Sequence, residues 1–327
     1  KSVMFKEYGG YLPIELSSGR PFYDGKNVVS LNAGRYAIVY AIEDAGWKQI
    51  WLPYYLCNTV ADSIRICLPQ VKIDYYHINE QLLPDLPFLS EDEGLLWVNY
   101  FGVQPESVID QMVQRYGSHL LIDQTQSFFS RPRSKAWQVY SCRKFFGVCD
   151  GSYVIHEGIT HRPLESRFSS LYAIHLLHSL EYGTNYAYSS SKENEARLAT
   201  VGIASMSPLT TAILNGIDYD EVQQKRRNNV RILHQILKPY NRFPLSPGAS
   251  SLFYPFLSDT PGLREKLIHK KIYVPKLWEE TSQNSNASPL EIRLSECLCC
   301  LPIDQRYTEE DMQFIGATVL NFLQEEL

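Results

Sequence analysis

The fold of this chain is decided by one segment, residues 119–156, which reads HLLIDQTQSFFSRPRSKAWQVYSCRKFFGVCDGSYVIH. Three short apolar runs in this segment predict strands at 119–123, 137–141 and 151–156. The first strand ends in a carboxylate, Asp123, and the second is followed by a lysine, Lys144. Two chemically reactive side chains therefore come directly after predicted strands.

The regions around this segment alternate between strand and helix patterns. Further strands are predicted at 49–53, 71–78 and 95–102, and helices at 34–46, 56–68 and 105–116. Strands that alternate with helices need crossover connections, which indicates a mostly parallel sheet covered on both faces. Such sheets bind ligands outside the carboxyl ends of their strands. Asn99, Asp123 and Ser141 lie at or near these ends, so we expect one crevice to gather them.

The second half of the chain has a different pattern. Helices are predicted at 166–182, 192–205, 219–239 and 308–327, and strands at 251–257 and 272–275. A chain of 327 residues is longer than one core usually supports. We therefore expect an α/β protein with an N-terminal arm (1–30), a large domain with a mostly parallel sheet (31–215) and a smaller α+β domain (216–327).

Composition excludes several classes of protein. The chain is 44% hydrophobic and 20% charged, as in ordinary globular proteins, and its net charge of -5 argues against a general nucleic-acid surface. No apolar run approaches the ~20 residues that cross a membrane, and the first residues do not resemble a secretory signal. The seven cysteines suggest no disulfide framework, and Cys297, Cys299 and Cys300 are interpreted as buried thiols. We expect a cytoplasmic protein.

Lys144 and Asp123 have a chemical interpretation and a structural one. An amine in apolar surroundings, here beside Phe145 and Phe146, loses its charge more easily and becomes a nucleophile towards an aldehyde. A buried carboxylate at a strand end needs a cationic partner, and a protonated pyridine nitrogen would serve. The alternatives are a surface lysine beside an aromatic pair and an aspartate that caps a turn.

A phosphate group would find donors near the start of the helix predicted at 34–46. The segment LNAGRYAI places Gly34, Arg35 and Tyr36 in the first turn, where backbone N–H groups are available to an anion. Ser141 would add a hydroxyl. Many unrelated helices also begin with Gly-Arg, so the order of all these motifs along the chain is the stronger observation.

That order resembles the DegT/DnrJ/EryC1/StrS sugar aminotransferases, enzymes of pyridoxal-phosphate (PLP) fold type I, from about residue 30 to 327. In IDQTQS, the resemblance implies that Asp123 pairs with the pyridine nitrogen and that Gln126 contacts the ring oxygen. Lys144 corresponds to the lysine that holds PLP as a Schiff base and acts as general acid and base. GTNY (183–186) is similar to the segment whose asparagine, here Asn185, reaches the phosphate bound by a neighbouring subunit.

The resemblance implies an aspartate-aminotransferase-like fold, PLP as cofactor, a homodimer with shared active sites, and transfer of an amino group to a keto-sugar. The donor is expected to be glutamate, and the sugar is expected to be linked to a nucleotide. Three positions depart from the family pattern: Cys57 stands where an aromatic residue often stacks on the cofactor, Val139 where a hydroxyl is common, and Ala187 where an arginine often follows. They leave two alternatives, a PLP-dependent sugar dehydratase or lyase and a non-catalytic scaffold.

Two further clusters have competing interpretations. Arg131, Arg133 and Lys135 in RPRSK would suit a nucleotide phosphate, but they are equally typical of a solvated turn. His175 and His178 share a predicted helix face, and without a third ligand they are interpreted as packing residues rather than as a metal site.

Overall fold

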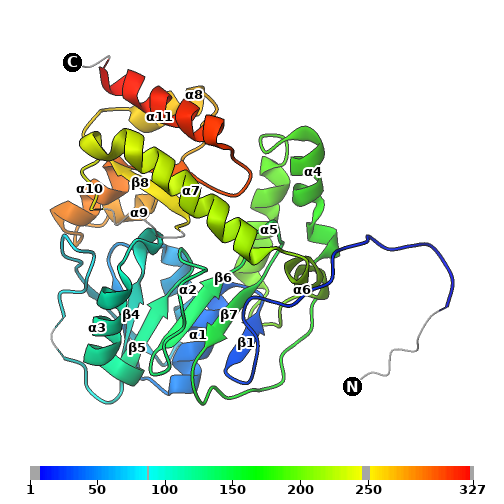
Figure 1. Cartoon of the computed structure of the whole chain (residues 1–327). Helices are drawn as coiled ribbons and strands as arrows, with labels where there is room; N and C mark the ends of the chain where they lie inside the picture. The colour runs from blue at the N-terminus through cyan, green and yellow to red at the C-terminus, as the bar shows by residue number, and fades with distance from the viewer. Residues whose placement is uncertain (1–7, 87, 245–250, 325–327) are drawn as a thin grey trace.

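The computed structural model, which describes residues 8–86, 88–244 and 251–324, is built on a seven-stranded sheet in the order β1-β7-β6-β5-β4-β2-β3 (Figure 1). β7 runs antiparallel to its two neighbours, and all other pairs in the sheet are parallel. The strands are β1 (Val28–Leu31), β2 (Gln49–Pro53), β3 (Lys72–Tyr76), β4 (Glu93–Val98), β5 (Leu120–Asp123), β6 (Trp137–Ser141) and β7 (Ser152–Ile155).

The register of the three central strands brings their carboxyl ends to one edge. Val98 of β4 lies beside Asp123 of β5, and Asp123 lies beside Val139 of β6. All residues of β5 and β6 are buried, as expected for parallel strands that are covered on both faces. The acid at the end of β5 is therefore held at a fixed place on this edge.

Helix α1 (Gly34–Ala45) packs against β5, β6 and β7. Its residues from Tyr36 to Ile42 are buried, and the helix ends at Gly46, whose φ of 73° is in the left-handed region that glycine adopts without strain. The other helices of this part of the chain are α2 (Asn58–Cys67), α3 (Glu106–Tyr116), α4 (Ile174–Tyr182), α5 (Tyr188–Thr200) and α6 (Pro208–Asn215), with short 3-10 turns at 100–102, 117–119 and 170–172.

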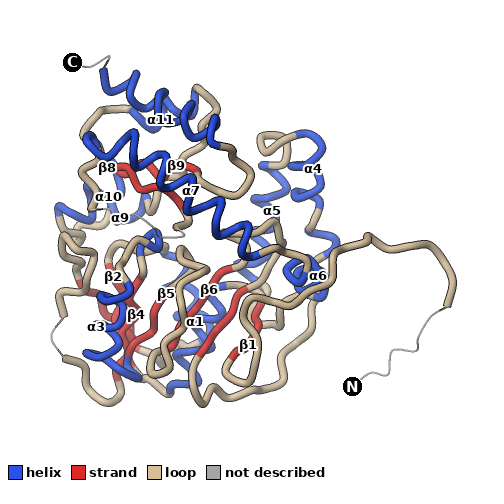
Figure 2. Tube along the Cα trace, in the orientation of Figure 1, coloured by secondary structure: helices blue, strands red, loops and turns tan. Residues whose placement is uncertain are grey.

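A second sheet pairs β8 (Phe253–Leu257) with β9 (Leu298–Pro302) in antiparallel orientation. Its apolar residues form a cluster of their own with those of α7, α8 and α11, and Figure 2 shows α7 and α11 beside this sheet. We call the seven-stranded sheet with α1 to α6 the large lobe, and the remainder from α7 onward the small lobe. The helices of the small lobe are α7 (Tyr219–Leu237), α8 (Leu263–His269), α9 (Glu279–Ser282), α10 (Pro289–Cys297) and α11 (Glu309–Gln324), with a 3-10 turn at 238–240.

The α/β fold class and most predicted elements are confirmed, usually to within a few residues. One strand was predicted to run from 95 to 102 but ends at Val98, because Phe101 and Gly102 have φ angles of 60° and 72°. The predicted strand at 272–275 is wrong. Its backbone bonds instead to the α8 region, where Ile272 N–H donates to the Leu267 carbonyl.

Several elements were not predicted, among them β1, α6, α8 and α10. The domain boundaries at 31 and 216 stay predictions. Residues 1–7 of the expected arm and the last three residues of the expected helix at 308–327 lie outside the described residues. Within the described part of the chain, no helix has both the length and the apolar character that crossing a membrane requires.

Candidate active site

A cavity of about 560 Å³ lies between the carboxyl edge of the large sheet and the small lobe. The large lobe contributes the ends of β4, β5 and β6 and the start of α1, and the small lobe contributes residues of α7 and of the segment after β9. Of the residues singled out from the sequence, the cavity wall includes Gly34, Arg35, Cys57, Asp123, Gln126, Ser141 and Lys144. The crevice expected at the strand ends is thus present.

Lys144 presents its amine at the wall of this cavity. The Nζ atom donates a hydrogen bond of 3.0 Å to Thr125 Oγ1. Solvent in the open cavity reaches the Lys144 side chain, so the residue counts as exposed. Protein nevertheless surrounds the amine on most sides. Burial of the amine lowers the pKa of Lys144 below its ordinary value, Arg143 and Arg35 lower it further, and Asp123 opposes them. These influences shift the amine towards its neutral, nucleophilic form.

The segment that carries Lys144 joins two antiparallel strands, β6 and β7, and is tied at its base. Cys142 N–H donates to the Gly151 carbonyl, and Gly151 N–H donates to the Asn32 carbonyl. Gly151 has a φ of 111°, and a Cβ there would approach Thr210 Cγ2 to 2.9 Å. Only glycine suits this position, so the turn that follows the lysine is sterically fixed.

Asp123 is 5% exposed and lines the same cavity as Lys144. One of its carboxylate oxygens, Oδ1, accepts a hydrogen bond of 2.9 Å from Thr125 N–H. No described residue hydrogen-bonds the other oxygen, Oδ2, which leaves it available to a ligand. The carboxylate and the amine therefore share one binding space, with Thr125 in contact with both.

Gln126 is fixed by its carbonyl end. Its Oε1 accepts a hydrogen bond of 2.7 Å from Phe101 N–H, which identifies the oxygen unambiguously because a backbone amide can only donate. The amide nitrogen is left as the donor available at the cavity wall. Phe101 lies in the turn that follows the end of β4 at Val98, so this turn positions a site residue.

The start of α1 forms another part of the wall. Ala33 precedes the helix without a side-chain cap, so the first N–H groups are not satisfied by a capping side chain. A Cβ at Gly34 would lie 3.2 Å from Thr125 Cγ2, which keeps the backbone close to β5. Ser141 is 7% exposed, and no described residue hydrogen-bonds its hydroxyl. These groups can receive an anion.

Two arginines and one glutamate lie beside this helix start. Arg35 Nη2 is 3.5 Å from Glu195 Oε2, and Arg143 forms an ion pair with the other oxygen of the same carboxylate. All three residues line the cavity. Burial lowers the pKa of Arg143 to about 10, and the charge of Arg35 lowers it as well. Positive charge is concentrated at this end of the cavity.

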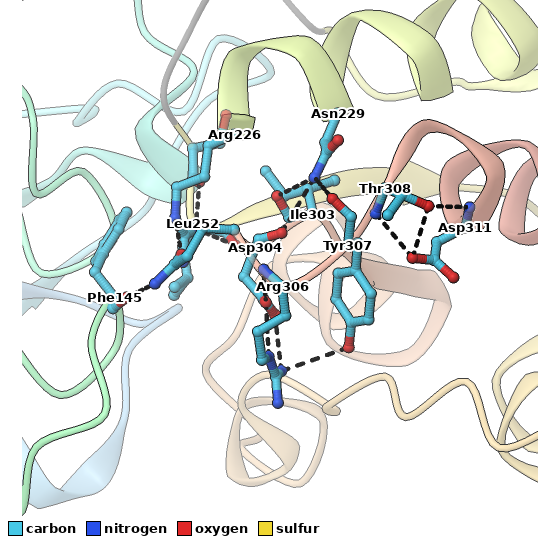
Figure 3. A network of polar contacts seen from close by, with 12 residues as sticks. Phe145, Arg226, Asn229, Leu252, Ile303, Asp304, Arg306, Tyr307, Thr308 and Asp311 are labelled. Carbon is cyan, nitrogen blue, oxygen red and sulfur yellow. Dashed lines mark hydrogen bonds and ion pairs between the residues drawn. The ribbon is translucent and has the colours of Figure 1, made fainter. Parts of the chain in front are cut away.

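The small lobe reaches the lysine segment through Arg226 of α7 (Figure 3). The Arg226 side chain is 2% exposed, its Nε donates to Gln305 Oε1 at 3.0 Å, and its Nη1 donates to the carbonyls of Ser251 and Leu252. The guanidinium carbon lies 4.5 Å from the centre of the Phe145 ring, and Gln305 Nε2 donates to the Phe145 carbonyl. The residue next to Lys144 is thus held from the small lobe.

Arg306 is the other small-lobe cation at the cavity. It forms a two-pronged ion pair with Asp304, in which Nε and Nη2 lie 2.7 and 2.9 Å from the two carboxylate oxygens. This pair raises the pKa of Arg306 well above its ordinary value, and the pKa of Asp304 is lowered although burial opposes the shift. Nη1 donates to no described residue, so Arg306 keeps a donor for a ligand.

Other residues singled out from the sequence lie elsewhere. Tyr36 does not line the cavity, because its hydroxyl donates to the Leu198 carbonyl and accepts from Gly202 N–H. Asn185 is exposed between α4 and α5. Arg133 pairs with Glu106 and Asp110 of α3, and none of the three RPRSK cations lines the cavity.

The two histidines of α4 make local contacts. His175 Nδ1 lies 2.8 Å from the Tyr172 carbonyl oxygen, and His178 packs against the rings of Tyr182 and Tyr186. Among the described residues, no cluster of three or more His, Cys, Asp or Glu side chains is arranged to hold a metal ion.

Several wall residues were not identified from the sequence. Thr125 lies inside IDQTQS and Arg143 directly precedes Lys144, so their positions in the motifs were the available signal. Arg226 lies in the helix predicted at 219–239 and Asp304 follows β9, and neither position stood in a motif that was assigned a role. Glu195 had no signal in the sequence, because only the fold brings α5 to the cavity.

Comparisons with known proteins connect the chain to solved structures. No protein-family model and no curated protein sequence matches it. The sugar aminotransferase CalS13 from Micromonospora echinospora superposes with a TM-score of 0.61 at 14% identity, over 90% of this chain and 86% of that one. A DegT DnrJ EryC1 StrS aminotransferase from Brucella abortus superposes with a TM-score of 0.59 at 12% identity, over 90% and 85%.

A sugar dehydratase has the same fold. A mutant of GDP-4-keto-6-deoxymannose-3-dehydratase (ColD) with bound GDP-perosamine superposes with a TM-score of 0.61 at 13% identity, over 89% of this chain and 88% of that one. Identities this low establish the fold and leave the reaction open. The chain therefore has the fold of these aminotransferases and of this dehydratase.

Proposed function

We propose that this chain is a PLP-dependent aminotransferase of the DegT/DnrJ/EryC1/StrS type that transfers an amino group to a keto-sugar. One observation carries the proposal: the amine of Lys144, with its lowered pKa, and the carboxylate of Asp123 line one cavity at the carboxyl edge of the sheet. A perturbed amine that shares a cleft with a fixed acid is typical of a catalytic site.

The donor set fits PLP. The cofactor needs an amine for its aldehyde, a carboxylate for its pyridine nitrogen, a donor for its ring oxygen and an anion site for its phosphate. Lys144, Asp123 and Gln126 would supply the first three, and Gly34, Arg35 and Ser141 the last. Apolar side chains such as Ile38, Val60 and Val98 complete the walls and suit an aromatic ring. Cys57 would border the ring where relatives often have an aromatic residue.

When bound, PLP supplies an aldehyde that takes up the amino group and a ring that delocalises negative charge. The protein contributes positioning and proton transfer. Lys144 would hold the cofactor through its Nζ and move a proton at the same atom. Asp123 would keep the pyridine nitrogen protonated through the oxygen that Thr125 does not engage. Because Thr125 contacts both groups, it sets their relative placement.

For the substrates, glutamate as donor and a nucleotide-linked keto-sugar as acceptor are the proposed pair. Both carry anionic groups, and the small-lobe wall offers Arg306, whose planar guanidinium suits a carboxylate or a phosphate. All seven cysteines are free thiols, which is consistent with the reducing cytoplasm where we place the enzyme.

A homodimer is part of the proposal. The segment from Phe168 to Tyr188 exposes a concentration of large apolar side chains, and no residue of α4 is buried. Leu171 and Leu180 are each at least 85% exposed, which is unusual for a surface that faces only water. Asn185 lies within this segment. A second copy that covered this segment would put Asn185 in the interface, from which the family resemblance implies that it reaches the partner's cavity.

The central test is amine transfer from glutamate to nucleotide-linked 4-keto sugars by the PLP-loaded protein, followed by mass spectrometry of the sugar. Transfer that is lost in Lys144→Ala supports the proposal. Release of ammonia or water without transfer would assign the chain to the sugar dehydratases or lyases. Failure to acquire any absorbance of protein-bound PLP would leave a non-catalytic scaffold. Lys135→Ala is the control, because this exposed lysine lies outside the cavity.

A further inference from the structure

The pair of arginines at the start of α1 shares one counter-ion. Arg35 and Arg143 contact the two different oxygens of the Glu195 carboxylate. The arginine side chains are 13% and 21% exposed, whereas that of Glu195 is 43% exposed. Two largely covered guanidinium groups therefore share one ion-pair partner, and that partner is the most exposed of the three side chains.

The remaining groups at this place are donors in need of an acceptor. Ser141 is nine-tenths buried, lines the cavity, and its hydroxyl has no partner among the described residues. The first turn of α1, which begins without a side-chain cap, adds its N–H groups. A ligand that satisfies all of them must bring more negative charge than a carboxylate, as a phosphate monoester does with its charge of roughly -1.5 to -2.

We infer that Arg35 and Arg143 form a phosphate-monoester site that Glu195 occupies in the ligand-free protein, and that Glu195 leaves when the phosphate binds. The inference rests on the proposed function for the identity of the phosphate as that of PLP, but the site itself follows from the arginine pair. Hydroxyl groups alone hold a phosphate through hydrogen bonds. Here the guanidinium groups add charge, and Glu195 acts as a competing anion that weakens the site.

The experiment measures the affinity of inorganic phosphate for the PLP-free protein by isothermal titration calorimetry. Glu195→Gln keeps the size of the side chain and removes its charge, so phosphate is expected to bind at least about fivefold more tightly. Arg143→Gln is expected to weaken binding about tenfold. Glu193→Gln, the same change at an exposed position of the same helix, is expected to leave the affinity unchanged.

An affinity in Glu195→Gln that is equal to or weaker than that of the unaltered protein overturns the inference, because Glu195 would then be holding the arginines in place. Circular dichroism of each variant confirms that it is folded. The two proposals fail separately. Tighter phosphate binding without any uptake of PLP keeps this site and removes the cofactor, whereas amine transfer with an unchanged phosphate affinity in Glu195→Gln keeps the enzyme and removes the competition.

Discussion

The charge state of Lys144 is controlled by burial and by several neighbouring charges. Burial lowers its pKa, two arginines lower it further, and Asp123 opposes them. Amine-labelling of Lys144 in the PLP-free protein should therefore rise with pH through a midpoint below the ordinary lysine value of 10.5. Mass spectrometry of labelled peptides over a pH series measures this midpoint. A midpoint at or above 10.5 would contradict the burial of the amine.

Replacing one of the two arginines provides a check on the cause of that shift. Arg143→Gln removes a positive neighbour, so the Lys144 midpoint should move upward while remaining a single transition. If the midpoint stays where it was, Arg143 makes no contribution to the lowered pKa of Lys144.

Asp123 is the second residue whose chemistry can be isolated. In Asp123→Asn the side-chain oxygen can still accept from Thr125 N–H, so the local structure should persist. The lost charge no longer keeps the pyridine nitrogen protonated, and we expect amine transfer to fall by about a hundredfold or more. Steady-state kinetics and the amount of bound PLP measure the two effects separately. A variant that retains full activity would remove Asp123 from the proposed mechanism.

At the level of elements, α7 links the two lobes through Arg226. Arg226→Met removes the donors to Gln305 Oε1 and to the Ser251 and Leu252 carbonyls, so the free energy of unfolding should fall by on the order of 3 kcal/mol. Urea denaturation measures the loss, and Arg226→Lys should recover part of it. Arg231→Met is the control, since this exposed arginine of the same helix bonds only to side chains of α7. Equal losses in Arg226→Met and Arg231→Met would show that Arg226 has no special role.

The elements also show how far the sequence alone reaches. Short apolar runs predicted the central strands, and these strands place Asp123 and the Lys144 segment at one edge because the carboxyl ends of parallel strands coincide. The strand end at Val98 escaped prediction, since an apolar run does not show that Phe101 takes a positive φ. The failed strand at 272–275 has strand-like residues whose backbone finds its partners in the α8 region.

Site residues that lie within a sequence motif could be predicted, whereas site residues that only the folding of the chain brings to the cavity could not. Asp123, Gln126 and Lys144 lie in motifs, and each motif points to its residue. Glu195 and Arg226 reach the cavity from helices far along the chain, and no pattern in α5 or α7 distinguishes them from surface charges. Tyr36 was expected in the site because of its place in the helix start, yet its rotation around α1 directs the hydroxyl to Leu198.

At the scale of the molecule, the exposed face of α4 bears on assembly. Sedimentation equilibrium should find a dimer, because the proposed self-contact would bury these apolar side chains. Leu180→Glu, which places a charge at an 85% exposed leucine of α4, should shift the protein towards monomers. Phe314→Glu is the control, because this 58% exposed phenylalanine lies on α11 in the small lobe. A monomer in the unaltered protein, or equal effects of both changes, would contradict the proposed interface.

The reversed direction of β7 has a consequence for the amine. Since β6 and β7 are antiparallel neighbours, the residues between them form a hairpin connection. Lys144 lies in this connection, and both ends of the connection are held at the same edge of the sheet. A connection held at both ends keeps the effective concentration of the Lys144 nitrogen at the cavity high, and a longer loop would lower it. Residues inserted between β6 and β7 are therefore expected to lower the effective concentration of the amine at the cavity while leaving the sheet intact.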